Sequence, residues 1–572
     1  MDRRTRFRDQ GPACDDTVAL RGRELGVPAR SMTDSGIVAF WVLVSRLTGF
    51  GRVAVMGAVL GPTYFGNIFQ TTVLVPIMLF GLLGGSLVGA VLVPLLVRWV
   101  DERDAAATRS LANGFLGVLL LVLAAVAALM ALAAPALLTL ATSAVGDPEV
   151  RQHQREVGSL LLYLLLPQML LYGVVAVGTA VQHAHGRFAV AAAAPVLENL
   201  GSIAVMGVSA LMFGFGTDVA RIPTSHLLLL GLGTTASVGL HAALQWWGAF
   251  RSGVTLAPSA GWRHPEIQQL VRIAFTSSGY AVLYNLTLFG CLIVAGSVPG
   301  GVIAFQIGQN FLALPVALGA MPLALVQLPQ MSRSFNRGDG AEFLTVYRTS
   351  IRLSFFITLP AGFLFMALAE PLAHAVAFGE MAGVAGLTMI TACIASVGPG
   401  VVGDAATSFS TSAAYARRDA LTPFRAMAIR AVIASAAMVL ALVAMEGVAL
   451  LWALGLGLST ANLAAAAYQY FALTRSMPPI DGGGSPLLGD FAASAAAAAI
   501  AWLVALGLQS GIGGGHAGSI GIALAAVAGG GAAYLAIQAA LRSPELHMLL
   551  SAVRSRHRCA GETTPLPSKG DI

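Results

Sequence analysis

Two arginines lie inside a long apolar segment near the start of the chain. The segment reads SRLTGFGRVAVMGAVLG over residues 45–61 and holds Arg46 and Arg52, with two glycines between them. An ionised side chain within membrane hydrocarbon costs about 2.5–3.5 kcal/mol, and it persists mainly where it faces a water-filled cavity or an opposite charge. A guanidinium is permanently charged and presents a planar fork of donors, which suits phosphate. We therefore expect these arginines to bind an anionic substrate group in a central cavity. The alternatives are pairing with a carboxylate for packing, and extension toward the membrane surface.

Two acidic residues also lie in the middle of apolar segments. Glu198 follows PVL and Asp404 follows VVG, each about ten residues from the end of its segment. A buried carboxylate can take up a proton or a cation, or it can form an ion pair with the arginines that changes between two states. We expect one of these coupling roles, and the alternative for both acids is a fixed structural pair.

Amide side chains gather at the start of each half of the chain. Any one of them alone is explained by a hydrogen bond between helices. Their concentration favours a hydrated cavity, and we assign four of them to its substrate-binding lining. These four are Asn67, Gln70, Gln306 and Asn310, with Asn285 and Gln309 nearby.

The composition excludes a soluble protein. Of 572 residues, 56% are hydrophobic and only 10% are charged, whereas soluble proteins carry roughly 25% charged residues. A membrane-spanning helix needs about 20 apolar residues, so the sequence predicts an all-α polytopic membrane protein with fourteen spans. They cover 34–60, 66–97, 111–142, 157–182, 188–213, 223–249, 267–297, 301–331, 345–369, 382–414, 425–445, 447–473, 488–509 and 516–541.

The distribution of basic residues predicts the orientation of these spans. With the N-terminus in the cytosol, 28 of the 33 Lys and Arg residues fall on the inside, and only Arg151, Arg155 and Arg221 fall outside. This bias is what the positive-inside rule requires. Both tails, 1–33 and 542–572, are therefore predicted to be cytoplasmic, in the inner membrane of a bacterium.

An internal repeat relates the two halves of the chain. Phe69-Gln70 recurs as Phe305-Gln306, and the motifs PLLVR and MALAAP recur as PQMSR and MALAEP at nearly the same offset. The offset spans six helices, an even number, so the halves share their orientation, and a substrate site is expected between them. We predict a first lobe over 34–250, a linker over 251–266, a second lobe over 267–475 and two further helices within 476–541.

Several function classes are excluded. The four cysteines are too far apart in sequence to suggest a disulfide framework or a metal site. The glycine-rich pieces lack the context of a nucleotide-binding loop, and no outer connection is long enough for a catalytic domain. We therefore expect a transporter with no cofactor and no nucleic-acid partner, because the net charge of +6 reflects arginines on the inner side.

Four segments resemble the MurJ (MviN) family of lipid II flippases, within the multidrug/oligosaccharidyl-lipid/polysaccharide (MOP) exporter superfamily. SRLTGFGR is similar to the opening of the family's first helix, and YARRDALTPFRAMAI is similar to the link into its eleventh. Weaker similarity is found in GRFAVAAAAPVLENL and LPVALGAMPLALVQLPQMSRSF. The chain resembles a divergent member of this family. Lys569 is its only lysine, which indicates the base composition of a high-GC bacterium, such as one of actinobacterial type.

The resemblance implies two six-helix lobes and a cationic cavity that receives the pyrophosphate of a polyprenyl-linked cell-wall precursor. It further implies a groove for the polyprenyl tail along the last two helices, and alternating access coupled to Na⁺, H⁺ or the membrane potential. Partners would be the lipid-linked oligosaccharide, the bilayer and the cell-wall synthesis machinery. The resemblance assigns Arg46 and Arg52 to headgroup binding.

The sequence departs from the family pattern where the family often carries charge. Val53, Asn67 and Asn310 stand at positions where charged residues are common, as do Phe80 and Gly81. The alternative function is therefore a small-molecule, drug or other glycolipid exporter of the same superfamily.

Overall fold

The structure is a computed structural model that describes residues 31–82, 92–261, 265–475, 487–509 and 515–550. Within these ranges the chain forms helices and no strand. Twelve helical segments in this part of the chain are long and apolar enough to cross a bilayer, which confirms the predicted polytopic all-α class. They are α2 (Ser31–Leu60), α5 (Ala105–Ala141), α6 with α7 (Pro148–Leu165 and Gln168–Ala184), α8 (Phe188–Phe213), α9 (Thr224–Arg251), α10 (Pro265–Gly296), α13 (Gly340–Ala367), α15 (Val384–Ala416), α16 (Leu421–Ala444), α17 (Gly447–Arg475), α18 (Leu487–Gln509) and α19 (His516–Ala540).

The other two predicted spans are interrupted helices. The span predicted over 66–97 contains α3 (Tyr64–Phe80) and the start of α4 (Val93–Asp101), with residues 83–91 outside the described part. The span predicted over 301–331 contains α11 (Gly301–Pro315), a π-helical turn and most of α12 (Met321–Asn336). Pro315 ends α11, because its ring and its missing N–H disfavour a regular α-helix. The π-helical turn that follows accommodates one more residue than an α-helical turn. Each predicted span thus coincides, over its described residues, with one helix or one interrupted helix.

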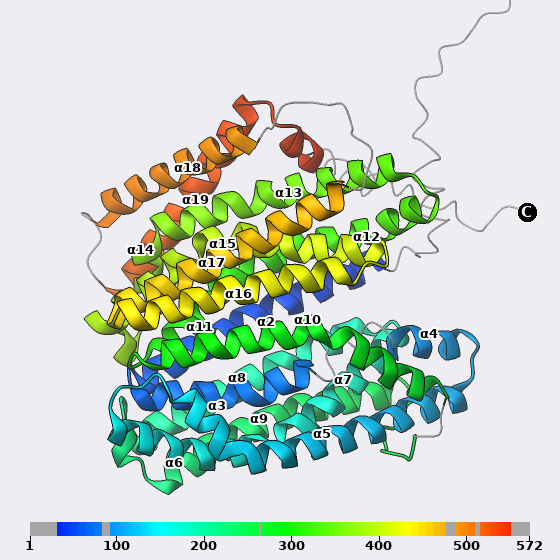
Figure 1. The fold of residues 1–572 in the computed structure, drawn as a ribbon, viewed down its shortest axis with the longest axis horizontal. Helices are drawn as coiled ribbons and strands as arrows, with labels where there is room; N and C mark the ends of the chain where they lie inside the picture. Colours follow the sequence, from blue (N-terminus) through cyan, green and yellow to red (C-terminus); the bar gives the residue numbers. More distant parts are fainter. Residues whose placement is uncertain (1–30, 83–91, 262–264, 476–486, 510–514, 551–572) are drawn as a thin grey trace, which may run out of the picture.

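The two halves of the chain pack their helices in the same order. In the first half α2 contacts α8, α8 contacts α9, and α7 contacts both α5 and α9. In the second half α10 contacts α16, α16 contacts α17, and α15 contacts both α13 and α17. The halves form two neighbouring groups with α2 and α10 between them, while α18 and α19 lie outside the repeat against α13 and α14 (Figure 1). This is the arrangement of two parallel six-helix lobes that the internal repeat predicts.

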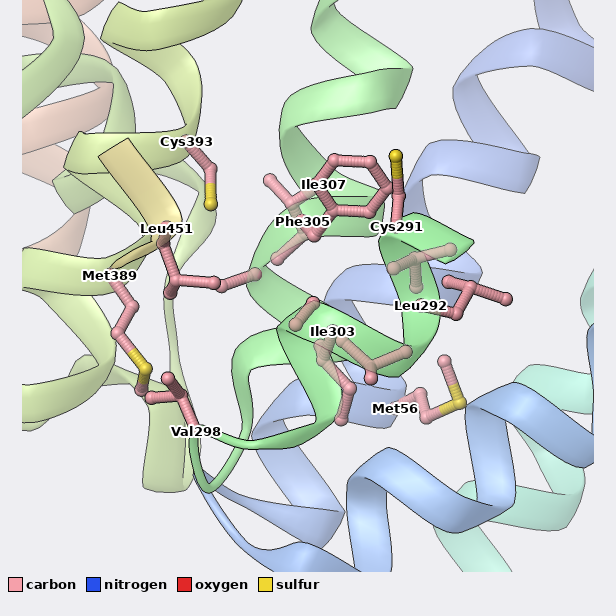
Figure 2. Close-up of a cluster of buried hydrophobic side chains, with 14 of the residues drawn as sticks. Met56, Cys291, Leu292, Val298, Ile303, Phe305, Ile307, Met389, Cys393 and Leu451 are labelled. Atoms are coloured by element: carbon pink, nitrogen blue, oxygen red, sulfur yellow. The ribbon is translucent and has the colours of Figure 1, made fainter. Parts of the chain in front are cut away.

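An apolar cluster joins the lobes where α11 enters the bundle. Figure 2 shows Ile303 and Phe305 of α11 with Met389 and Leu451 of the second lobe on one side and Met56 of α2 on the other. The repeated phenylalanines, Phe69 and Phe305, both belong to this cluster, and each is only 1% exposed. Close packing of this kind leaves no passage for a polar solute between the lobes at this end.

Two glycines bring the backbones of the lobes together beside this cluster. Gly300 has φ +78°, and a Cβ there would lie 2.4 Å from the Cα of Pro62. Gly379 has φ +58°, and a Cβ there would lie 2.5 Å from the carbonyl oxygen of Ala58. Both positions therefore need glycine, for the backbone conformation as well as for space. These loops lie on the side predicted to face outward.

A capping motif fixes the start of α16. Asp419 accepts hydrogen bonds from the backbone N–H groups of Leu421 and Thr422, both at 3.0 Å, and from the Thr422 hydroxyl at 2.6 Å. Burial of Asp419 raises its pKa, but these hydrogen bonds and the nearby Arg417 outweigh burial, so the pKa lies below its usual value. The Asp of the YARRDALTPF segment is therefore a helix-capping residue, and the Thr hydroxyl donates to it.

We expect Asp419→Ala to lower the free energy of unfolding by about 1 kcal/mol, because it removes the cap of α16. Since the folded-state pKa of Asp419 is lowered, its stabilisation is present above the unfolded-state pKa and is lost as the pH falls through the folded-state pKa. Thermal unfolding of the detergent-solubilised protein at neutral and acidic pH measures both effects. Asp419→Asn retains an acceptor and serves as the control; an unchanged melting temperature in Asp419→Ala would contradict the capping role.

Candidate functional site

A cavity of about 400 Å³ lies between the lobes on the inner side of the apolar cluster. Helices α2 and α8 line it from the first lobe together with α3, and α11 lines it from the second lobe. Five of the six predicted substrate-binding residues are on its wall: Arg46, Arg52, Gln70, Gln306 and Asn310. The structure therefore brings together polar residues that are as much as 264 positions apart in the sequence.

Arg46 and Arg52 occupy different depths of this cavity. They are six residues apart on α2, which is about 9 Å along the helix axis. Arg46 is exposed, whereas the side chain of Arg52 is only 23% exposed. In the part of the chain that the structure describes, Arg46 has no carboxylate within ion-pair distance. The cavity thus presents one unpaired guanidinium near its more accessible part and a second one deeper inside.

Asn199 holds α2 in position between the two arginines. Its amide nitrogen donates to the carbonyl oxygen of Ser45 at 3.2 Å and to the Thr48 hydroxyl at 3.1 Å. Gly49 lies beside this side chain, and a Cβ there would be in ordinary contact with the same amide nitrogen, at 3.4 Å. The asparagine of the VLENL segment therefore orients the arginine-bearing helix.

Glu198 is the carboxylate that meets Arg52. Its Oε1 lies 3.5 Å from Nη1 of Arg52 and accepts a hydrogen bond from the Tyr172 hydroxyl at 3.1 Å. Its Oε2 lies 2.8 Å from Nδ1 of His241. At 3.5 Å the contact with Arg52 is long for a charge-assisted hydrogen bond. Arg52 therefore remains available to a second anion in the cavity.

A very small cavity of about 20 Å³ lies beside Arg52 and Gln70. Ser202 and Thr234 line it, and both hydroxyls are buried with no hydrogen-bond partner among the described protein groups. A space of this size with several polar neighbours is sufficient for one water molecule. Polar groups thus lie next to Arg52 in this space, together with the apolar side chains of Met56, Phe69, Val73 and Met206.

The glutamines of the internal repeat both line the main cavity. Gln70 of α3 and Gln306 of α11 follow the two buried phenylalanines, and both face the cavity. Gln306 donates to the side-chain oxygen of Asn310 at 3.4 Å. The repeat therefore places equivalent amides from the two lobes on the wall of one site.

Asn67 does not line the cavity, contrary to our expectation. It is 1% exposed, and its amide nitrogen donates to the carbonyl oxygens of Gly296, at 3.2 Å, and Val298, at 2.7 Å. Its side-chain oxygen accepts from the N–H of Val302 at 3.0 Å. All three bonds join the first lobe to the turn between α10 and α11. Asn67, Gly300 and Gly379 together form a contact between the lobes that we call the outer seal.

The comparison with protein families decides the identity of the chain. The model of the family described as lipid II flippase MurJ matches residues 56–528. The chain belongs to the MurJ family. It is therefore a transporter and not an enzyme. The matched range begins after Arg52, so the placement of the two arginines comes from the structure.

Individual relatives agree with this membership of the MurJ family. A probable lipid II flippase MurJ of Rhizobium tropici is 24% identical over 433 residues, which cover 75% of this chain and 79% of the relative. A lipid II flippase MurJ of Burkholderia cenocepacia is 21% identical over 397 residues, covering 68% and 74% of the two chains.

Solved structures show the same fold. A lipid II flippase MurJ in an inward closed conformation matches with a TM-score of 0.65 at 16% identity, covering 88% of this chain and 98% of the other. An inward-facing multidrug resistance transporter of the MATE family, in the MOP superfamily, matches with a TM-score of 0.59 at 16% identity, covering 76% and 94%. The two-lobed arrangement is thus common to MurJ and MATE structures.

Asp404 lies apart from the arginines of the cavity in this MurJ-family member. It is on α15 of the second lobe, where the charge that acts on it is Arg430 of α16. Arg430 is buried, donates from Nε to the side-chain oxygen of Asn462 at 2.6 Å, and stands 5.0 Å from the ring centre of Tyr284. A switching ion pair between Asp404 and Arg46 or Arg52 is therefore not formed here.

Sequence reasoning missed three residues of these polar clusters: Tyr172, His241 and Arg430. His241 and Arg430 are ionisable groups within apolar spans, which is the signal that identified Glu198 and Asp404. We counted Arg430 among the cytoplasmic basic residues of 417–430, although it lies within the span predicted over 425–445. Tyr172 gives no such signal, because tyrosines are common in membrane helices.

Proposed function

We propose that this protein moves a polyprenyl-pyrophosphate-linked cell-wall precursor, lipid II or a close relative, from the inner to the outer leaflet by alternating access. The observation that carries the proposal is the pair of arginines in a cavity between the lobes, one of which has no carboxylate partner among the residues that the structure describes. A pyrophosphate that bears a lipid on one side and a sugar on the other carries two negative charges. Two guanidinium groups balance them.

The different depths of the arginines suggest an order of binding. Arg46 is exposed and meets the headgroup first, and Arg52 then takes the pyrophosphate deeper into the cavity. The amides of Gln70, Gln306 and Asn310 are available to hydroxyl and amide groups of the glycan. The outer seal keeps the headgroup from leaving outward until the lobes rearrange. In this proposal the polyprenyl tail stays in the membrane along α18 and α19.

The proposal also includes a location and partners. The transporter lies in the bacterial inner membrane with both tails in the cytosol, as the distribution of basic residues favours. Its substrate is made on the cytosolic side and is consumed outside by the machinery that polymerises the cell wall. Of these partners, the lipid-linked substrate and the bilayer follow from membership of the family.

Translocation in proteoliposomes tests the function. Purified full-length protein is reconstituted with a fluorescent lipid II, and the fraction accessible to an externally added reductant is measured with time. We expect protein-dependent exposure of the inner-leaflet lipid and no such exposure in protein-free vesicles. The superfamily alternative predicts instead uptake of cationic dyes. Dye transport without any movement of lipid-linked precursor would overturn the flippase proposal.

A further inference from the structure

Glu198 is a carboxylate shared by groups from three neighbouring helices. Arg52 comes from α2, Tyr172 from α7 and His241 from α9, and all three contact the carboxylate within 3.5 Å. These are the titratable groups that face Glu198 from the helices packed against α8, among the described residues. Arg46 lines the same cavity without contacting Glu198. The charge of this cluster therefore depends on Arg52, Glu198 and His241.

Arg52 is the only member of the cluster that also lines the main cavity, so an incoming phosphate and Glu198 compete for one guanidinium. When both arginines face a doubly charged pyrophosphate, the charges of the ligand and the arginines cancel. The carboxylate of Glu198 is then a surplus negative charge in a buried position, which is costly. A proton on the cluster removes this surplus.

The amide side chains of Gln245 and Gln182, next to His241, form hydrogen bonds that fit a neutral imidazole ring at His241. Nδ1–H of His241 donates to Glu198 at 2.8 Å, while Nε2 faces the amide nitrogen of Gln245 at 3.5 Å and acts as acceptor. Protonation of His241 would set two donors against each other across this contact. The Gln245 side chain cannot turn without loss, because its Nε2 also donates to the carbonyl oxygen of Ala191 at 3.1 Å. Gln182 is held in the same way: it donates to Gln245 Oε1 at 2.6 Å and to the carbonyl oxygens of Gly178 and Gln245 at 3.2 and 3.3 Å. A proton on Glu198 leaves these amide bonds unchanged.

The small cavity beside Arg52 offers the cluster a site for one water molecule. Ser202 is one helical turn after Glu198 on α8, and its unpartnered hydroxyl faces the 20 Å³ cavity together with that of Thr234 and with Arg52. A water molecule there has three polar neighbours.

We propose that Glu198 and His241 form a proton-binding pair that takes up one proton when a pyrophosphate engages Arg52. The proposal rests on the proposed function, because it requires a pyrophosphate in the cavity. By thermodynamic linkage, binding of the pyrophosphate and of the proton strengthen each other. The affinity for substrate therefore rises as the pH falls, by at most tenfold per pH unit for one proton.

Calorimetry on the full-length protein in detergent tests this linkage. The probe is a short-chain polyprenyl pyrophosphoryl sugar, whose disubstituted pyrophosphate has no group that titrates near neutral pH. Titrations at pH 6.0–8.5, in buffers of different ionisation enthalpy, give the affinity and the number of protons taken up. We expect uptake approaching one proton at the alkaline end and an affinity that increases toward acidic pH. Glu198→Gln is expected to take up no proton and to bind equally well across the range.

Two further variants keep the test decisive if Glu198→Gln fails to fold. His241→Gln retains a donor toward Glu198 but removes a proton acceptor, so the rise in affinity shifts to more acidic pH. His226→Gln is the matched control, because His226 is also buried on α9 but bonds to Ser209 at 2.6 Å, away from Arg52; it should behave like the unaltered protein. Arg52-dependent binding with constant affinity and no proton uptake would overturn the linkage and leave the proposed function standing. Absence of binding, or binding that survives Arg52→Ala, would overturn both.

Discussion

Arg52→Ala is expected to abolish flipping of the lipid-linked precursor while leaving the protein at its normal level in the membrane. Arg52 is the deeper of the two cavity arginines, and its long contact with Glu198 leaves its donors available to phosphate. Loss of a hydrogen bond to a charged group costs about 1.5–3 kcal/mol, so the affinity for the headgroup should fall roughly 10- to 100-fold. Complementation of a strain depleted of its flippase, with immunoblotting of the membrane fraction, measures the effect.

Two controls separate charge from folding. Arg221→Ala removes an exposed arginine of the outer loop before α9 and should leave complementation intact. Arg52→Lys keeps the charge but not the forked geometry, and an intermediate activity is expected. Full activity of Arg52→Ala would assign Arg52 to packing against Glu198 and would remove the central support for the flippase mechanism.

Asn67→Ala is expected to open the outer seal. The substitution leaves two carbonyl oxygens and one N–H without the partner that now joins the lobes. Loss of these bonds should destabilise the sealed state by at least about 2 kcal/mol, which changes the ratio of sealed to open protein about 30-fold. Spin labels at Ser143, just after α5, and Val384, the first residue of α15, are exposed on the outer side of the two lobes and report the change as a longer distance between the labels.

Removal of a different amide side chain serves as the control. It shows whether the effect of Asn67→Ala comes from the bonds between the lobes or from the loss of any polar side chain. Asn285→Ala removes a side chain on α10 that donates only within its own helix, to the carbonyl oxygen of Ala281 at 2.8 Å. The distance between the labels should stay unchanged in this variant. If Asn67→Ala also leaves it unchanged, the apolar cluster around Phe69 and Phe305 holds the lobes together without help from Asn67.

The sequence by itself determined the class, the order of the spans and the internal symmetry. These features follow from local chemistry, because a bilayer requires about 20 apolar residues for each crossing and penalises charge within it. The same penalty identified Arg46 and Arg52 as residues that need a polar chamber, and the structure places both on its wall. The repeat likewise predicted a site between the lobes, and Gln70 and Gln306 both line the cavity found there.

Only the tertiary structure decided which polar residues face one another. Asn67 and Gln70 are three residues apart on one helix, yet Asn67 bonds the opposite lobe while Gln70 lines the cavity. Glu198 meets Arg52 and His241, whereas the charge that acts on Asp404 is Arg430 in the other lobe. The physical reason is that burial and partners of an intramembrane polar group depend on the rotation of each helix and on its neighbours. Helix packing fixes both, and hydropathy along the chain does not record them.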